Sequence, residues 1–246
     1  MLYDHIKNNY AEVSGIVESD FEYSHEIYGE RFYQLRIRTS RLSASSDIIP
    51  LLLSERLIDI TRSYIGKQIR VSGQFRSFNH HYDNKSHLIL YLFVREFAFC
   101  EDGEEGEFPQ MNDIYLDGYL CKPSVYRRTP RGREICDLLL AVNRAYSKSE
   151  YIPCICWGRN ARYAARIPVG SRVRVRGRIQ SRMYQKRLED DRVIMKEAFE
   201  ISVARMEFTS EEDEAFLSVA DSGSIRSRET KEREERYEDS APQRNK

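Results

Sequence analysis

Stretches in which apolar and polar residues alternate recur along most of the chain, and this pattern predicts β-strands. In the clearest stretch, Val173, Val175 and Ile179 alternate with arginines, so the apolar side chains share one strand face and the arginines share the other. Apolar residues at near-helical spacing predict short helices at 55–64 and 160–167. Strands are expected at or around residues 13, 35, 48–53, 71–75, 116, 138, 151–157, 173–179 and 199–208.

The chain contains an internal repeat. Residues 13–17 align with residues 116–120 at an offset of 103 residues, and the same offset places Leu35 on Leu138 and Arg41 on Arg144. After an insertion of one residue, an offset of 104 places Gly73 on Gly177. A register held through so many apolar and glycine positions indicates two copies of one fold, of which the first has diverged.

Each copy has three strands, a helix and two further strands, which is the order of the OB-fold, a five-stranded and partly open Greek-key barrel. We therefore predict an all-β protein with two tandem OB-fold domains, at 1–105 and 112–209, joined by a linker at 106–111. Gly73 and Gly177 fall inside the fourth strand of each copy and are expected to mark a bend or a β-bulge. Apolar residues are sparse from 210 to 246, and this charged tail is expected to be disordered.

The formal net charge of zero hides an uneven distribution of charge along the chain. Residues 1–111 hold 12 Lys and Arg against 17 Asp and Glu, and residues 210–246 hold 7 against 11, so both segments are acidic. Residues 112–209 hold 20 against 11, a net charge of +9. A local excess of this size indicates that the second copy binds a polyanion. The alternative is that these arginines only keep the surface soluble.

Three segments of the second copy carry arginines, and the last two also carry aromatic side chains: LLLAVNR at 138–144, YIPCICWGRNA at 151–161 and VGSRVRVRGRIQSRMY at 169–184. Cations for the phosphates and flat rings for the bases are what a protein needs to hold unpaired nucleic acid. In order and spacing the segments closely resemble the bacterial single-stranded DNA-binding protein family, over roughly residues 112–208. The resemblance implies an OB-fold and base stacking by four aromatic residues, Tyr146, Tyr151, Trp157 and Tyr184.

The sequence around these rings supports that role to different degrees. Trp157 stands near a strand end and is followed by Gly158 and Arg159, and Tyr184 is expected in a loop among basic residues. The alternative for Trp157 is a core tryptophan that closes the barrel. Tyr146 and Tyr151 have the alternative of packing at strand edges with a solvated hydroxyl group.

Arginines form the second group of predicted contacts. Arg174, Arg176 and Arg178 share one strand face, where like charges are costly without an anion, so we expect them to contact phosphates. The alternative is a solvated face. Arg127 matches a family arginine, and the other predicted nucleic-acid contacts are Arg128, Arg131, Arg159, Arg166, Arg182 and Lys186.

The first copy lacks these features. The repeat places a serine, Ser24, at the position of Arg127, and it replaces the four rings by Ser43, Ile48, Ser54 and His80. Because this copy is also acidic, we expect it to serve in assembly or as a structural domain, with its nucleic-acid surface lost.

Other kinds of chemistry have little support. There is no phosphate-binding Gly-rich loop and no H-E-x-x-H motif, so we predict a binding protein without a cofactor rather than an enzyme. His80, His81, Asp83 and His87 cluster in one loop without the framework of a metal site. Five cysteines without a C-x-x-C pair predict buried reduced thiols. No segment approaches the roughly 20 apolar residues of a membrane helix, the first residues lack a signal-peptide core, and a cytoplasmic protein is expected.

The resemblance implies a protein that coats and protects single-stranded DNA during replication, recombination and repair. Because the family usually presents four OB domains per assembly, two per chain imply a homodimer. An accessory primosome protein, a scaffold for protein contacts and a single-stranded RNA-binding protein are alternatives, the last because stacking does not sense the 2′-hydroxyl group. The family tail ends in acidic residues followed by Pro-Phe and recruits repair enzymes. This chain ends in APQRNK, which gives no support for that recruitment.

Overall fold

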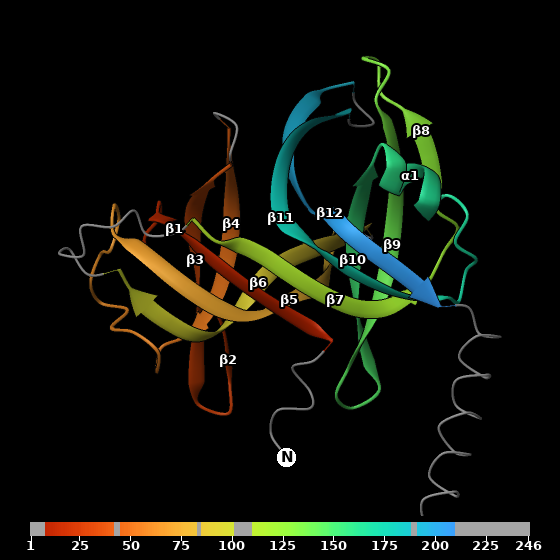
Figure 1. Ribbon diagram of the computed structural model, residues 1–246. Helices are drawn as coiled ribbons and strands as arrows, with labels where there is room; N and C mark the ends of the chain where they lie inside the picture. The colour runs from red at the N-terminus through yellow and green to blue at the C-terminus, as the bar shows by residue number, and fades with distance from the viewer. Residues whose placement is uncertain (1–7, 42–44, 83–84, 101–109, 188–190, 210–246) are drawn as a thin grey trace, which may run out of the picture. The chain divides into compact units, whose positions relative to one another are not determined.

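The computed structural model describes residues 8–41, 45–82, 85–100, 110–187 and 191–209 (Figure 1). Within these ranges the protein consists of β-strands and a single short helix, α1 (Arg159–Ala164). The predicted tail at 210–246 and most of the predicted linker lie outside the described residues.

The two halves of the chain contain the same order of strands. The first half is formed by β1 (Asn9–Val17), β2 (Glu22–Ile27), β3 (Glu30–Ser40), β4 (Ser46–Ser54), β5 (Gln68–Tyr82) and β6 (Lys85–Phe99). The second half is formed by β7 (Asn112–Leu120), β8 (Val125–Arg128), β9 (Glu134–Arg144), β10 (Lys148–Trp157), β11 (Arg172–Arg187) and β12 (Val193–Thr209), with α1 between β10 and β11.

Each half closes into a barrel by the same pairings. In the first barrel β1 pairs antiparallel with β3 and β5, and a parallel pairing of β4 with β6, with Leu51 opposite Leu92, closes the circle. In the second barrel β7 pairs with β9 and β11, and β10 pairs in parallel with β12, with Cys154 opposite Ile201. The prediction of an all-β protein with tandem OB-folds is confirmed. Each barrel carries one more strand than the five expected, because β2 and β8 form short hairpins with β3 and β9.

Alternating apolar residues fill the interior of both barrels, as the period of two requires. Phe75 is the largest fully buried side chain of the first barrel. The buried positions include equivalent pairs of the repeat, such as Leu35 and Leu138, Ile49 and Ile152, Val71 and Val175.

Strands β1 and β7 pair antiparallel and join the two barrels in one continuous sheet. Ala11 lies opposite Ile114, which is its own equivalent in the repeat at an offset of 103. On either side, Asn9 faces Leu116 and Val13 faces Asn112, so the pairing has local two-fold symmetry about the Ala11–Ile114 pair. The repeat in the sequence is therefore a repeat in the structure.

Gly73 and Gly177 stand where the barrels bring two strands close together. The pairing of β5 with β6 shifts its register between Ser72 and Gly73, which confirms the irregularity expected at Gly73. A Cβ atom would lie 2.0 Å from the carbonyl oxygen of Phe93 at Gly73 and 2.2 Å from that of Ser202 at Gly177. Only glycine fits such an approach without a shift of the backbone.

The two predicted helices have different outcomes. The second is confirmed by α1, which covers most of the predicted segment. The first prediction is wrong, because residues 55–67 form a series of turns. Asp59 accepts hydrogen bonds from the backbone N–H of Thr61 at 3.0 Å and from its hydroxyl group at 2.6 Å, which stabilise a turn in place of a helix.

The five cysteines are all free thiols. Cys136, Cys154 and Cys156 are buried as expected, and burial raises the pKa of Cys156 to about 12. Cys100 is only half-buried and Cys121 is exposed, which corrects the prediction for these two residues. No helix in the described part of the chain is both long enough and apolar enough to cross a membrane.

Candidate nucleic-acid interface

Trp157 lies at the end of β10 on the outer face of the second barrel. The side chains of Ile152, Cys154 and Cys156 point into the core, so Ile155 and Trp157 belong to the opposite face of the strand. The Trp157 side chain is 38% exposed and lines an open cavity of about 690 Å³. A core tryptophan would not be exposed in this way.

Arginines surround this cavity. Three of them are predicted contacts, Arg127 from β8 and Arg178 and Arg182 from β11. Two were not among the predicted residues, Arg133 from the loop before β9 and Arg41 from the first barrel. The signals were present in the sequence: Arg133 belongs to the basic segment RRTPRGR, and Arg41 is one of the arginines that the repeat preserves.

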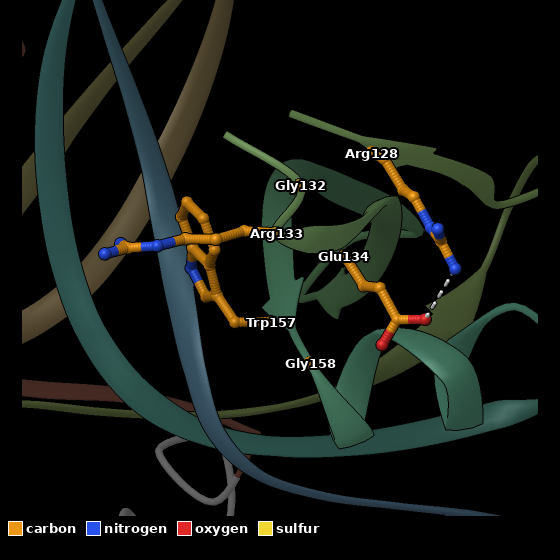
Figure 2. Close-up of a pocket in the computed structure, with 6 residues that line it drawn as sticks. All are labelled: Arg128, Gly132, Arg133, Glu134, Trp157 and Gly158. Atoms are coloured by element: carbon orange, nitrogen blue, oxygen red, sulfur yellow. Dashed lines mark ion pairs between the residues drawn. The ribbon is translucent and has the colours of Figure 1, made fainter. Parts of the chain in front are cut away.

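A second depression adjoins the same tryptophan and is lined by Arg128, Gly132, Arg133, Glu134, Trp157 and Gly158 (Figure 2). Its carboxylate, Glu134, accepts a hydrogen bond from the hydroxyl group of Tyr126 at 2.6 Å and pairs with Arg162 at 3.2 Å and Arg128 at 3.8 Å. Because three donors compensate this carboxylate, it does not leave the depression negatively charged.

Several of the cavity arginines form ion pairs. Arg127 pairs with Asp137 at 2.8 Å, with both side chains more than a third exposed, and Arg182 approaches Glu200 at 3.4 Å. The exposed Arg127–Asp137 pair contributes about 0–1 kcal/mol, so exchanging its carboxylate for a phosphate oxygen costs little. The Glu200 side chain, in contrast, is buried. Arg41 differs, because it pairs with the fully buried Asp47, with 2.7 Å between Arg41 Nε and Asp47 Oδ2.

Arg174 and Arg176 lie on the predicted face of β11 but line neither cavity. Arg174 donates to Asp117 at 3.2 Å and approaches Glu207 at 3.4 Å, and Arg176 pairs with Asp113 at 3.1 Å. Carboxylates on neighbouring strands therefore relieve the repulsion that the sequence argument assigned to phosphate. Of the three predicted arginines on this face, the structure brings Arg178 to the Trp157 cavity.

Tyr151 and Tyr146 lie away from this cavity. Tyr151 shares the outer face of β10 with Trp157 but stands six residues before it, about 20 Å along an extended strand. Its backbone N–H donates to the hydroxyl oxygen of Ser77 in the first barrel at 2.8 Å. Tyr146 is at the tip of the β9–β10 hairpin with a φ of 63° and an almost fully exposed ring.

The remaining predicted residues are spread over the surface of the second barrel. Tyr184 belongs to β11 rather than to a loop, and the guanidinium carbon of Arg182 lies 5.5 Å from its ring centroid. Arg131, Arg159 and Arg166 are exposed on the β8–β9 loop and at the two ends of α1. The side chain of Lys186 lies outside the described residues, as do those of His80, His81, Asp83 and His87.

Two tandem OB barrels, with a tryptophan and five arginines around one open cavity of the second, define a protein of the OB-fold class. Residues 111–209 match the model of the Single-strand binding protein family. The second half of the chain is therefore similar to the single-strand binding protein family.

Known proteins match part of the chain in sequence and most of it in fold. Single-stranded DNA-binding protein 2 of Listeria innocua is 37% identical over 82 residues, which are 30% of this chain and 52% of that protein. The single-stranded DNA-binding protein of Halalkalibacterium halodurans is 34% identical over 104 residues, which are 39% of this chain and 61% of that protein. The chain thus spans less than two thirds of the length of these relatives.

The crystal structure of the wild-type single-stranded DNA binding protein from Thermus aquaticus is similar in fold to both barrels, with a TM-score of 0.63. The similarity covers 82% of this chain and 93% of that chain at 17% sequence identity.

Proposed function

We propose that this protein binds single-stranded DNA without catalysis. The observation that carries the proposal is the exposed ring of Trp157 in a cavity lined by Arg41, Arg127, Arg133, Arg178 and Arg182. A ring that stacks on a base contributes about 1–3 kcal/mol, and arginines supply the contacts to the phosphates. The match of residues 111–209 to the single-strand binding protein family, and the names of the relatives, support this function.

Base stacking is assigned to the second barrel in this proposal. At the position equivalent to Trp157 the first barrel has Ser54, which is buried and donates a hydrogen bond to Glu30. At the position equivalent to Tyr151 it has Ile48, whose backbone N–H donates to the hydroxyl oxygen of Ser181. Neither residue offers a ring to a base.

A fluorescence titration tests the function directly. Trp157 is the only tryptophan of the chain, so its emission reports on the cavity alone. Oligo-dT is expected to quench the emission and to bind more weakly as the salt concentration rises, because cations are released from the phosphates. Duplex DNA of the same length serves as the control, since paired bases cannot stack on the ring. Equal affinity for duplex and single strand would contradict the proposal, and stronger binding of oligo-rU than of oligo-dT would redirect it to RNA.

The proposal extends to the assembly of the protein. Two chains are expected to associate and to present four OB barrels, as the family resemblance implies. Sedimentation equilibrium distinguishes this state from a monomer, because the expected mass is twice the 29.0 kDa of one chain.

A further inference from the structure

A cluster of arginines lies on the first barrel around the ring of Phe93. The guanidinium carbon of Arg76 lies 4.1 Å from the ring centroid and that of Arg95 lies 4.9 Å from it. Among the described residues, no carboxylate forms an ion pair with either arginine, and Arg76 donates only to the side-chain oxygen of Gln74 at 2.8 Å. The two cations are therefore held in place by an aromatic ring and not by an anion.

A third arginine reaches this cluster from the second barrel. Arg144 pairs with Glu150 at 3.2 Å, and Glu150 is buried and also accepts the backbone N–H of Ser77 at 2.7 Å. Arg76 thus lies close enough to Arg144 for their charges to interact, while the Glu150 carboxylate is already bonded to Arg144 and Ser77. The pKa of Arg76 is lowered to about 10, mainly by burial and also by the positive charges of Arg144 and Arg95, against an opposing effect of Glu150.

The equivalent place in the second barrel has the opposite character. The repeat places Gln180 on Arg76, and Gln180 donates to the buried Glu200 at 2.7 Å. A barrel of this fold therefore closes without a cation at this position. Arg76 adds charge that folding does not require, and its repulsion from two other arginines costs stability unless an anion joins the cluster.

Strand β10 connects the Trp157 cavity with the segment of the first barrel that carries Arg76. The outer face of β10 runs from Trp157 through Ile155 to Tyr151, and the backbone of Tyr151 is bonded to Ser77, the residue that follows Arg76. A strand of nucleic acid that leaves the cavity along this face reaches the first barrel at the arginine cluster.

We propose that Arg76, Arg95 and Arg144 form a phosphate-binding subsite for the backbone of a single-stranded nucleic acid that extends from the Trp157 cavity. The subsite differs in kind from the cavity, since its ring, Phe93, carries guanidinium groups and orients cations instead of stacking on a base. This inference rests on the proposed function, and it gives the first barrel a second contact with the ligand in addition to Arg41.

The double variant Arg76→Gln with Arg95→Gln tests the subsite. Glutamine occurs at the position equivalent to Arg76 in the second barrel, and Arg95 is exposed, so the fold is expected to accept both changes. The matched control, Arg56→Gln with Arg62→Gln, removes the same charge from the exposed segment 55–67, where these arginines pair with Glu30 and Asp59. The affinity for an oligo-dT long enough to reach both sites is measured at several salt concentrations. Each phosphate contact contributes about 0.7 to the slope of log K against log salt, so the test variant should lower the slope by about 1.4 and the control should leave it unchanged.

The outcomes separate the two proposals. If wild-type protein does not bind oligo-dT, the proposed function fails. If wild type and both variants bind with the same slope, the function stands and the subsite is refuted. A further measurement adds inorganic phosphate as a competitor of oligo-dT. If phosphate competes only when Arg76 and Arg95 are present, while the oligo-dT slope is the same in wild type and variant, the cluster is a site for small anions and the inference is overturned. Should the double variant unfold, Arg95→Gln alone keeps the test, because Arg95 is exposed, and a slope lowered by about 0.7 is then expected.

Discussion

Asp47 and Glu150 occupy equivalent positions in the two barrels, and each accepts a hydrogen bond from the backbone of the opposite barrel. The N–H of Ser181 donates to Asp47 at 2.8 Å, and the N–H of Ser77 donates to Glu150 at 2.7 Å. Both carboxylates are buried. The two barrels are thus connected by reciprocal polar contacts in addition to the pairing of β1 with β7.

Replacement of Asp47 by alanine is expected to destabilise the protein by about 3 kcal/mol, because it leaves Arg41 without its buried partner and the Ser181 N–H without an acceptor. The exposed pair of Asp59 with Arg62 provides a control, and Arg62→Ala, which leaves the bonds of Asp59 to Thr61 intact, should cost less than about 1 kcal/mol. Urea unfolding at constant salt measures both values. Equal midpoints for the two variants would show that the contact between the barrels adds no stability.

Replacement of Trp157 by alanine should weaken the binding of oligo-dT by about 1–3 kcal/mol, through the loss of one stacking interaction. Tyr163→Ala is the matched control, because Tyr163 is an aromatic residue of similar exposure on α1 that lines neither cavity. Anisotropy of a labelled oligonucleotide measures the affinities. The assignment of the cavity fails if both variants lose the same affinity.

Replacement of Gly177 by alanine should destabilise the second barrel by about 3 kcal/mol, since the new Cβ atom would lie 2.2 Å from the carbonyl oxygen of Ser202. The loss should appear as a lower midpoint of thermal unfolding. A stable Gly177→Ala protein would mean that β11 and β12 can move apart at this point.

The five thiols should differ in their reactivity. Cys121 is exposed and is expected to react first with iodoacetamide at pH 8. The pKa of Cys156 is raised to about 12, so at this pH only about one thiol in ten thousand is ionised, and it should react after unfolding. Peptide mass spectrometry before and after denaturation distinguishes the sites. Modification of Cys156 in the native protein at the rate of Cys121 would contradict this order.

The sequence predicted the barrels well because their signals are local or repeated. Alternation located the strands, and the repeat identified the buried pairs, such as Val71 with Val175. The helix expected at 55–64 failed because the side chain of Asp59 bonds to Thr61 and stabilises a turn, a competition that hydrophobic spacing does not reveal.

The candidate site was harder to predict because it depends on contacts between distant strands. The sequence predicted that Arg174 and Arg176 contact phosphates. In the structure they pair instead with Asp117 and Asp113 of the neighbouring strand β7. The net charge of residues 1–111 is likewise a sum over the whole first copy. It is negative although arginines gather around Phe93 in the folded barrel.

The two-fold symmetry of the β1–β7 pairing has a consequence for how the sequences of the two copies diverge in evolution. When a strand pairs with the same strand of a second, identical chain, every substitution appears on both sides of the interface. Here Ala11 faces Ile114, and each position of the pair belongs to the same chain, so a substitution alters one barrel and leaves the other intact. Dilution cannot separate the halves either, because covalent linkage makes their pairing independent of protein concentration. One barrel is thereby free to keep Trp157 while its neighbour acquires Arg76, and a chain of this design can present two chemically different surfaces to one ligand.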